Sequence, residues 1–132
     1  MKKLPTVAAL AAIVLFAASP GSAADDPSIG EPIRSQVQAS MAAFIEAKTI
    51  DGVYSHYDPV TGELLGLELA ELHVGIVRKG DFYVSCADFV DAEGNKVDLD
   101  FLVLPDQDGV RTVQAIVHKA DGVKRPYHLE SE

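Results

Sequence analysis

The pattern of apolar and polar residues predicts one amphipathic helix early in the chain. Between about residues 31 and 48, apolar residues recur at spacings of three and four: Ile33, Val37, Met41, Phe44 and Ile45. This spacing gathers them on one stripe of a helix, which must be buried against another element. The alanines between them favour the helical conformation.

After Gly52 the period of the pattern changes from about 3.6 residues to two. Apolar residues then alternate with polar or small ones in five segments, at 53–57, 65–70, 82–90, 97–104 and 110–119. Turn sequences rich in Gly, Asp, Asn and Pro separate these segments. Strands joined by such short turns form an antiparallel meander. We therefore predict a sheet of four or five strands.

The fold class that follows is α+β, with the N-terminal amphipathic helix packed on one face of the meander. This order of elements resembles cystatin-like domains, in which a sheet wraps a helix, and the resemblance concerns architecture alone. Residues 31–132 are expected to form a single domain. A Pro- and Asp-rich segment, 25–30, precedes it, and we expect this segment to be loose.

The turn at residues 92–94 predicts how the strands on either side of it pair. A three-residue loop with its glycine in the left-handed conformation brings apolar residues of the two strands face to face. On the opposite, outer face the same register sets Asp88 beside Asp98 and Cys86 beside Asp100. This register therefore brings three carboxylates and the thiol together.

The turn at residues 107–109, treated in the same way, pairs Asp98 with His118 on that outer face. The two turns together predict a row of ligating side chains across three neighbouring strands: Asp88, Asp98 and His118, with Cys86 and Asp100 in the next row.

The turn at residues 79–80 leaves two registers open. A two-residue loop there places His73 opposite Cys86 and Glu71 opposite Asp88. A three-residue loop moves His73 to the other face of the sheet.

The predicted outer face thus carries five side chains of types that bind metals, and a sixth, His73, joins them if the loop at 79–80 has two residues. The candidate ligands are His73, Cys86, Asp88, Asp98, Asp100 and His118. Facing carboxylates destabilise a strand pair unless something neutralises them, and a bound cation would do so. This donor set suits Zn²⁺ or another divalent transition metal. The spacing matches no CxxC or HExxH motif, and the alternative is a solvated sheet face, on which polar residues are ordinary.

Apolar residues also occur on the predicted outer face, away from the acidic rows. They are Phe82, Val84, Leu102, Leu104 and Ile116. Such a patch indicates a partner surface or a homodimer. Alternatively, the C-terminal segment 120–132 folds over the patch and covers it with Val123, Tyr127 and Leu129.

The first residues have the pattern of a cleavable signal peptide. Lys2 and Lys3 precede an apolar run, 7–18, and small residues follow to Ala24, after which we expect cleavage. The run is shorter than the roughly 20 residues of a membrane span, although an uncleaved anchor is the alternative. The pattern predicts a periplasmic or secreted protein with no membrane association after cleavage.

Charge and cysteine content narrow the range of partners. The chain has a formal charge of −9, which becomes −11 without Lys2 and Lys3. An acidic surface repels nucleic acid and anionic lipid, so we expect neither as a partner. Cys86 is the single cysteine, which excludes a disulfide within the chain.

Several segments resemble a small group of uncharacterised bacterial periplasmic proteins: residues 73–78, 83–89, 98–101 and 118–119. The most specific elements are Cys-x-Asp-Phe at 86–89 and Asp-x-Asp-Phe at 98–101. The resemblance covers about half of the mature domain and implies the location and the fold, but no activity.

We therefore expect a non-catalytic binding module for a metal cation or a small polar ligand. The alternative is a protein-interaction or homodimerisation domain. A thiol enzyme with Cys86 as nucleophile and His73 as base is a further alternative. The surrounding carboxylates disfavour a thiolate, and no P-loop, GxSxG motif or dinucleotide fingerprint is present.

Overall fold

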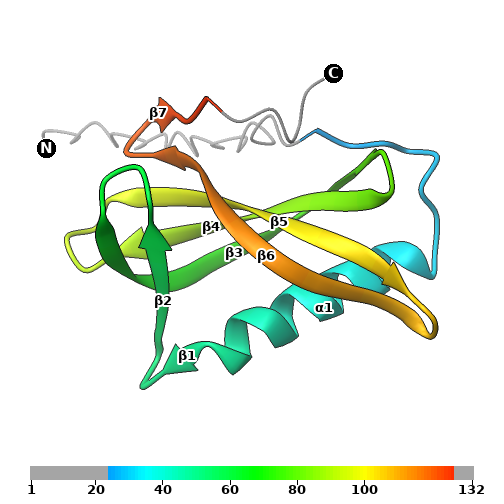
Figure 1. Cartoon of the computed structure of the whole chain (residues 1–132), viewed down its shortest axis with the longest axis horizontal. Coiled ribbons are helices and arrows are strands. Elements are labelled where there is room, and N and C mark those ends of the chain that lie inside the picture. Colours follow the sequence, from blue (N-terminus) through cyan, green and yellow to red (C-terminus); the bar gives the residue numbers. More distant parts are fainter. Residues whose placement is uncertain (1–23, 127–132) are drawn as a thin grey trace, which may run out of the picture.

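The computed structural model describes residues 24–126, which form one helix and one antiparallel sheet (Figure 1). The elements in chain order are α1 (Ile33–Ala47), β1 (Thr49–Ile50), β2 (Val53–Asp58), β3 (Glu63–Lys79), β4 (Phe82–Asp91), β5 (Lys96–Asp106), β6 (Gly109–Ala120) and β7 (Val123–Lys124). Each strand pairs with the next strand along the chain. The predicted α+β class and the antiparallel meander are confirmed.

The sheet has seven strands rather than the four or five predicted. The additional strands, β1 and β7, have two residues each and are too short to produce an alternation in the sequence. The five predicted segments correspond to β2 to β6. The predicted signal peptide, residues 1–24, lies outside the described residues except for Ala24.

The helix α1 lies across one face of the sheet and buries its predicted apolar stripe (Figure 1). Its fully buried residues are Val37, Met41 and Ile45. The opposing layer of the sheet is apolar and includes Leu67, Phe89, Leu99, Phe101 and Val103. Burial of one such side chain contributes ~1.5–3 kcal/mol, so this core determines which face of the sheet points away from α1. We call that second face the outer face.

The segment before α1 is anchored, which differs from the loose segment predicted for residues 25–30. The backbone N–H of Asp26 donates to the carbonyl of Ile76 at 2.8 Å, and the N–H of Ile76 donates to the Asp25 carboxylate at 3.1 Å. Ile29 is only 9% exposed and belongs to the core. The physical reason is that β2 pairs only with residues 63–67 of β3. The backbone N–H and C=O groups on the same edge of the rest of β3 therefore need other hydrogen-bond partners.

The register between β4 and β5 follows the sequence prediction. Asp88 faces Asp98 and Cys86 faces Asp100. Gly94, in the turn, has a φ of 81°, the left-handed conformation that the loop requires. The pairing is predictable because a local turn alone determines it.

The register between β5 and β6 follows the prediction only at its centre, where Asp100 faces Ile116. Extra residues in β6 shift the pairing at both ends, so Asp98 faces Lys119 and not His118. The predicted Asp98–His118 pair is therefore wrong. A β-bulge of this kind re-aims side chains, and it frees His118 to contact a different carboxylate.

The register between β3 and β4 combines two departures from the prediction. The turn contains residues 80–81, because Lys79 pairs with Phe82. Between the pairs Leu72–Ala87 and Ile76–Ser85, residues 73–75 of β3 lie opposite Cys86 alone. This bulge compensates for the displaced turn, so Glu71 faces Asp88, as in the two-residue-loop alternative, whereas His73 lies in the bulge and not in a single pair with Cys86.

Candidate functional site: a thiol, carboxylate and imidazole cluster

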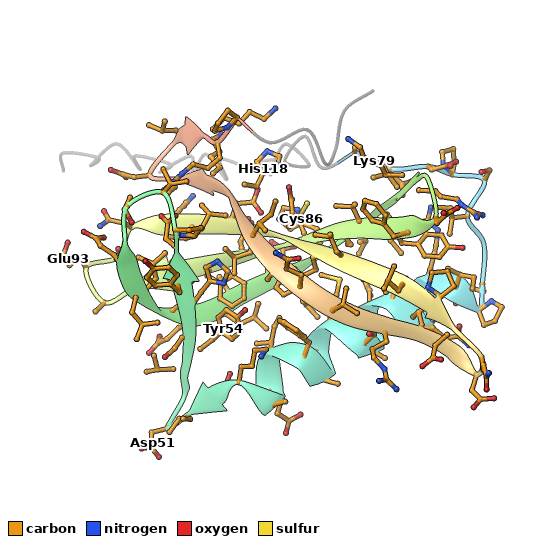
Figure 2. All side chains as sticks on the ribbon, in the orientation of Figure 1. Asp51, Tyr54, Lys79, Cys86, Glu93 and His118 are labelled. Atoms are coloured by element: carbon orange, nitrogen blue, oxygen red, sulfur yellow. The ribbon has the colours of Figure 1, made fainter. Side chains whose placement is uncertain are left out.

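The outer face carries a cluster of polar side chains that is more buried than an ordinary solvated sheet surface. Cys86 is 3% exposed and Asp100 is 2% exposed. Cys86 and His118 both lie on the side of the sheet away from α1 (Figure 2). Burial of a carboxylate requires hydrogen bonds or a neighbouring positive charge to compensate for lost hydration.

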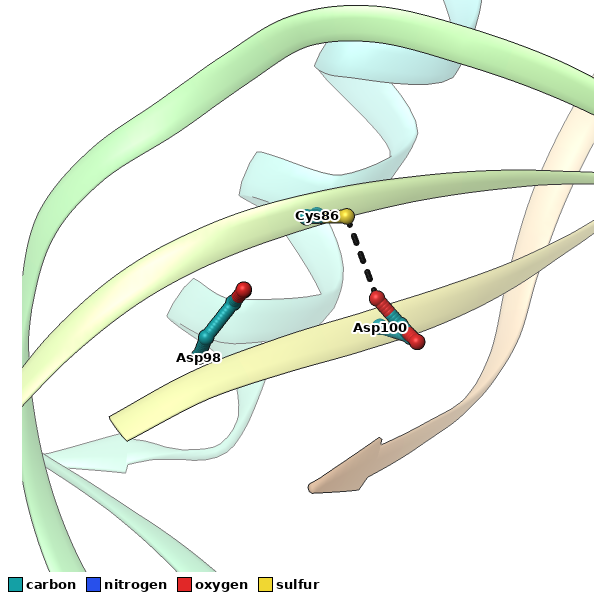
Figure 3. Close-up of side chains that lie close together, drawn as sticks. All are labelled: Cys86, Asp98 and Asp100. Atoms are coloured by element: carbon teal, nitrogen blue, oxygen red, sulfur yellow. Dashed lines mark hydrogen bonds between the residues drawn. The ribbon is translucent and has the colours of Figure 1, made fainter. Parts of the chain in front are cut away.

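Asp100 is the acceptor that joins the thiol and one imidazole. The Cys86 Sγ donates to Asp100 Oδ1 at 3.1 Å (Figure 3). The Nδ1 of His118 lies 2.7 Å from Asp100 Oδ2. Strands β4, β5 and β6 each supply one residue of this chain of contacts, so sheet pairing holds them at fixed separations.

Asp98 lies beside this chain and completes a group of three residues of types that can bind a metal ion. One ligand atom from each of Cys86, Asp98 and Asp100 lies within 4.8 Å of the others (Figure 3). The Oδ1 atom of Asp98 is buried and has no hydrogen-bond partner in the part of the chain described. A buried acceptor without a donor is rare and unfavourable.

The electrostatic environment of Asp98 opposes its ionised form. Burial raises the pKa of Asp98 to about 7, and the carboxylates of Asp100 and Asp88 add to this effect. The imidazoles of His118 and His73 act in the opposite direction. Loss of the Asp98 proton near neutral pH would therefore favour the arrival of a positive charge.

His73 and Asp88 form a second contact next to this group. The Nε2 of His73 lies 2.9 Å from Asp88 Oδ2. Burial alone would lower the pKa of His73, but the hydrogen bond to Asp88 and the negative charges of Asp88, Asp98 and Glu71 outweigh it and raise the pKa. The other ring nitrogen, Nδ1, is buried without a hydrogen-bond partner among residues 24–126.

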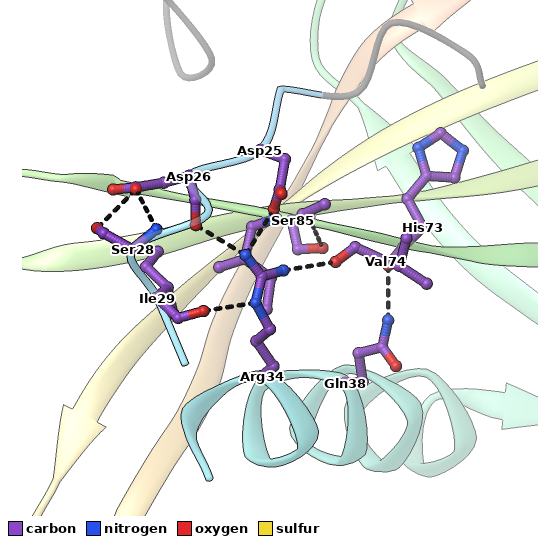
Figure 4. A network of polar contacts seen from close by, with 11 residues as sticks. Asp25, Asp26, Ser28, Ile29, Arg34, Gln38, His73, Val74 and Ser85 are labelled. Atoms are coloured by element: carbon purple, nitrogen blue, oxygen red, sulfur yellow. Dashed lines mark hydrogen bonds and ion pairs between the residues drawn. The ribbon is translucent and has the colours of Figure 1, made fainter. Parts of the chain in front are cut away.

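Side chains that the sequence analysis missed hold the bulge at residues 73–75. Gln38 donates to the carbonyl of His73 at 2.9 Å, and Arg34 donates to that of Val74 at 3.3 Å (Figure 4). The buried Ser85 hydroxyl donates to the carbonyl of Gly75 at 2.7 Å. The sequence contained one signal for these contacts. Arg34 and Gln38 are four residues apart, and each follows an apolar residue of the helix stripe, so both lie beside the face of the helix that packs on the sheet.

The structure therefore brings the six predicted ligating residues into two neighbouring sets. One set contains Cys86, Asp98 and Asp100, with His118 bonded to Asp100. The other set contains His73 and Asp88. The structure places these residues near one another, as the sequence predicted, but His118 contacts Asp100 and not Asp98.

The predicted apolar patch is only partly exposed. Val84 is 1% exposed and Leu104 is 41% exposed, while Phe82, Leu102 and Ile116 are half-buried. Val84 therefore cannot present a surface to a partner. Of the residues that were expected to cover the patch, Val123 is 68% exposed, and Tyr127 and Leu129 lie outside the described residues.

Comparisons with models of known protein families, with curated proteins and with solved structures found no match. Within residues 24–126, no helix has the length and apolar character needed to cross a membrane. The function must therefore be argued from the site itself.

Proposed function

We propose that this protein is a non-catalytic binding module that holds one divalent transition-metal cation on the outer face of its sheet. The observation that carries the proposal is the grouping of Cys86, Asp98 and Asp100 within 4.8 Å. The buried Asp98 Oδ1 without a hydrogen-bond partner is a second, independent indication. A cation would satisfy this oxygen and neutralise the neighbouring carboxylates.

The chemistry of the donors favours a borderline metal such as Zn²⁺. Zn²⁺ accepts thiolate, imidazole and carboxylate ligands in tetrahedral sites, whereas Ca²⁺ and Mg²⁺ require oxygen ligands. Binding would displace the thiol proton of Cys86 and any proton on Asp98, because metal ligands must be deprotonated. Affinity should therefore rise with pH.

The location completes the proposal. The basic, apolar and small-residue pattern of 1–24 supports export to the periplasm or the medium. The formal charge of −11 that remains after export attracts cations to the domain. A cystatin-like arrangement of sheet and helix belongs to the same proposal, but it supports the architecture and not the ligand.

The test is Zn²⁺ titration calorimetry on the mature domain, supported by native mass spectrometry without chelator. We expect one ion per chain, and we expect Cys86→Ser and Asp98→Asn each to lower the affinity at least ~10-fold, because even the loss of a residue that only supports a ligand costs about 10–100-fold. Asp108→Asn is the matched control, because it removes an exposed carboxylate of the β5–β6 turn. The proposal fails if the wild type does not bind, or if all variants bind equally.

A further inference from the structure

The contact between His73 and Asp88 resembles the hydrogen bond that orients a metal-binding histidine. Histidines that bind metals usually donate their second ring N–H to a carboxylate, which fixes the tautomer and the ring orientation. The Nε2 of His73 lies 2.9 Å from Asp88 Oδ2. That contact leaves Nδ1 as the coordinating atom, and Nδ1 is buried without a hydrogen-bond partner in the described residues.

The bulge in β3 places this histidine next to the cluster. Residues 73–75 lie opposite Cys86, where a regular strand would have one residue. Three successive carbonyls of the bulge accept hydrogen bonds from Gln38, Arg34 and Ser85. The position of the His73 backbone therefore depends on these bonds and not on the contact of its ring with Asp88.

We propose that His73 is the specificity-determining residue of the cation site, with Gln38 as a positioning residue that acts through it. This inference rests on the proposed function. The ring is not part of the group within 4.8 Å that Cys86, Asp98 and Asp100 form, so the side chains of that group must close around the ion toward Nδ1, while Asp88 keeps the ring oriented. An imidazole nitrogen favours Zn²⁺, Cu²⁺ and Ni²⁺ over Mn²⁺, which prefers oxygen ligands.

The direct test compares Zn²⁺ and Mn²⁺ affinities of the wild-type mature domain and of His73→Gln. We expect the Zn²⁺ affinity to fall ~10–100-fold while the Mn²⁺ affinity changes less than about twofold, because carboxylates provide the Mn²⁺ ligands. In parallel, the ¹⁵N chemical shift of the His73 Nδ1 in the wild type should move on addition of Zn²⁺. A structural role for His73 would change neither the ratio of affinities nor this shift.

The positioning role of Gln38 is tested with Gln38→Ala against Gln36→Ala, a glutamine of the same helix that lies near Gly109. We expect Gln38→Ala to lower the Zn²⁺-to-Mn²⁺ affinity ratio and Gln36→Ala to leave it unchanged. Gln38→Lys, which retains a donor for the carbonyl of His73, should restore much of the ratio.

The outcomes separate the two proposals. If the wild type binds Zn²⁺ and His73→Gln retains the wild-type ratio of affinities, the role of His73 is disproved and the proposed function stands. If the wild type does not bind Zn²⁺ at all, both proposals fail. If His73→Gln does not fold, two other measurements test the role of His73: the ¹⁵N shift of its Nδ1 in the wild type on addition of Zn²⁺, and the Zn²⁺-to-Mn²⁺ affinity ratio of Gln38→Ala. If neither the shift nor the ratio changes, the inference is overturned.

Discussion

The carboxylate of Asp98 is surrounded on the outer face by two further carboxylates and two imidazoles. Its raised pKa has a consequence for stability, because the unfolded chain binds the same proton much less tightly. Between about pH 4, near the pKa of an unperturbed aspartate, and about pH 7, the pKa of Asp98 in the folded protein, the folded state retains a proton that the unfolded state has lost. The free energy of unfolding therefore falls as pH rises through this window.

Asp98→Asn should remove this pH dependence. At pH 8, with a chelator present, we expect the variant to be more stable than the wild type by roughly 1–2 kcal/mol, a value reduced for solvent screening. At pH 4 the difference should be small, because the wild-type Asp98 is then protonated in the folded state and about half protonated in the unfolded state. Urea unfolding at pH 4, 6 and 8 measures this, and parallel curves for the two proteins would contradict it.

The same substitution should weaken cation binding, as proposed above. A residue that lowers stability while it supports binding is the expected compromise at a functional site. A purely structural hydrogen-bond network would show no such opposition, because removal of one member would weaken the fold and leave no binding to lose.

Among the elements, the helix and the strands β2 to β6 were predictable because each has a local periodic pattern. The register of β4 and β5 was predictable for the same reason, since a short turn with Gly94 sets it. The cluster of Cys86, Asp98 and Asp100 follows from that single register. This part of the site could therefore be predicted from the local sequence alone.

The bulges were not predictable, because contacts between distant residues stabilise them. In β6, the Ser40 hydroxyl of α1 accepts the N–H of Thr112 at 2.6 Å, near the position where the register shifts. In β3, Arg34 and Gln38 bind the carbonyls of the bulge from the same helix. An alternating pattern contains no information on these contacts, and this is why the pairing of His73 was left undecided. The shift that displaces His118 lies at the other end of β6, between Val117 and Lys119, where the N–H of Arg125 donates to the carbonyl of His118 at 2.7 Å.

Ser85→Ala tests whether the bulge of β3 is a stabilised element. The substitution removes a buried donor to the carbonyl of Gly75, and we expect a loss of about 1–3 kcal/mol in the free energy of unfolding. Ser55→Ala on β2, an exposed serine, is the control and should change stability by less than ~0.5 kcal/mol. Equal stability of the two variants in chemical denaturation would show that the bulge does not depend on this bond.

At the scale of the whole molecule, one buried ion pair joins segments that are 67 residues apart. Arg125 Nη2 lies 2.6 Å from Asp58 Oδ2, and the side chains are 11% and 2% exposed. The backbone N–H of Arg125 also donates to the carbonyl of His118 at 2.7 Å. The pair therefore connects the end of the described chain to the turn between β2 and β3 and to a residue of the site.

Arg125→Ala should destabilise the protein by about 3 kcal/mol, because it leaves the carboxylate of Asp58 buried without its cation. The matched control is Arg111→Ala, which breaks an exposed pair with Asp106 and should cost less than ~1 kcal/mol. Thermal unfolding compares the two variants. A small effect of Arg125→Ala would mean that solvent reaches Asp58 readily.

The part of the β3 edge that β2 does not cover determines where a recombinant version of the protein should begin. Asp25 and Asp26 occupy the hydrogen-bonding groups of Ile76 on that edge. A recombinant version that begins after residue 26 would expose a strand edge, to which a second chain could add by backbone pairing. A version that begins at Asp25 retains this cover, so two residues at the start of the domain separate a protected sheet from one prone to aggregate.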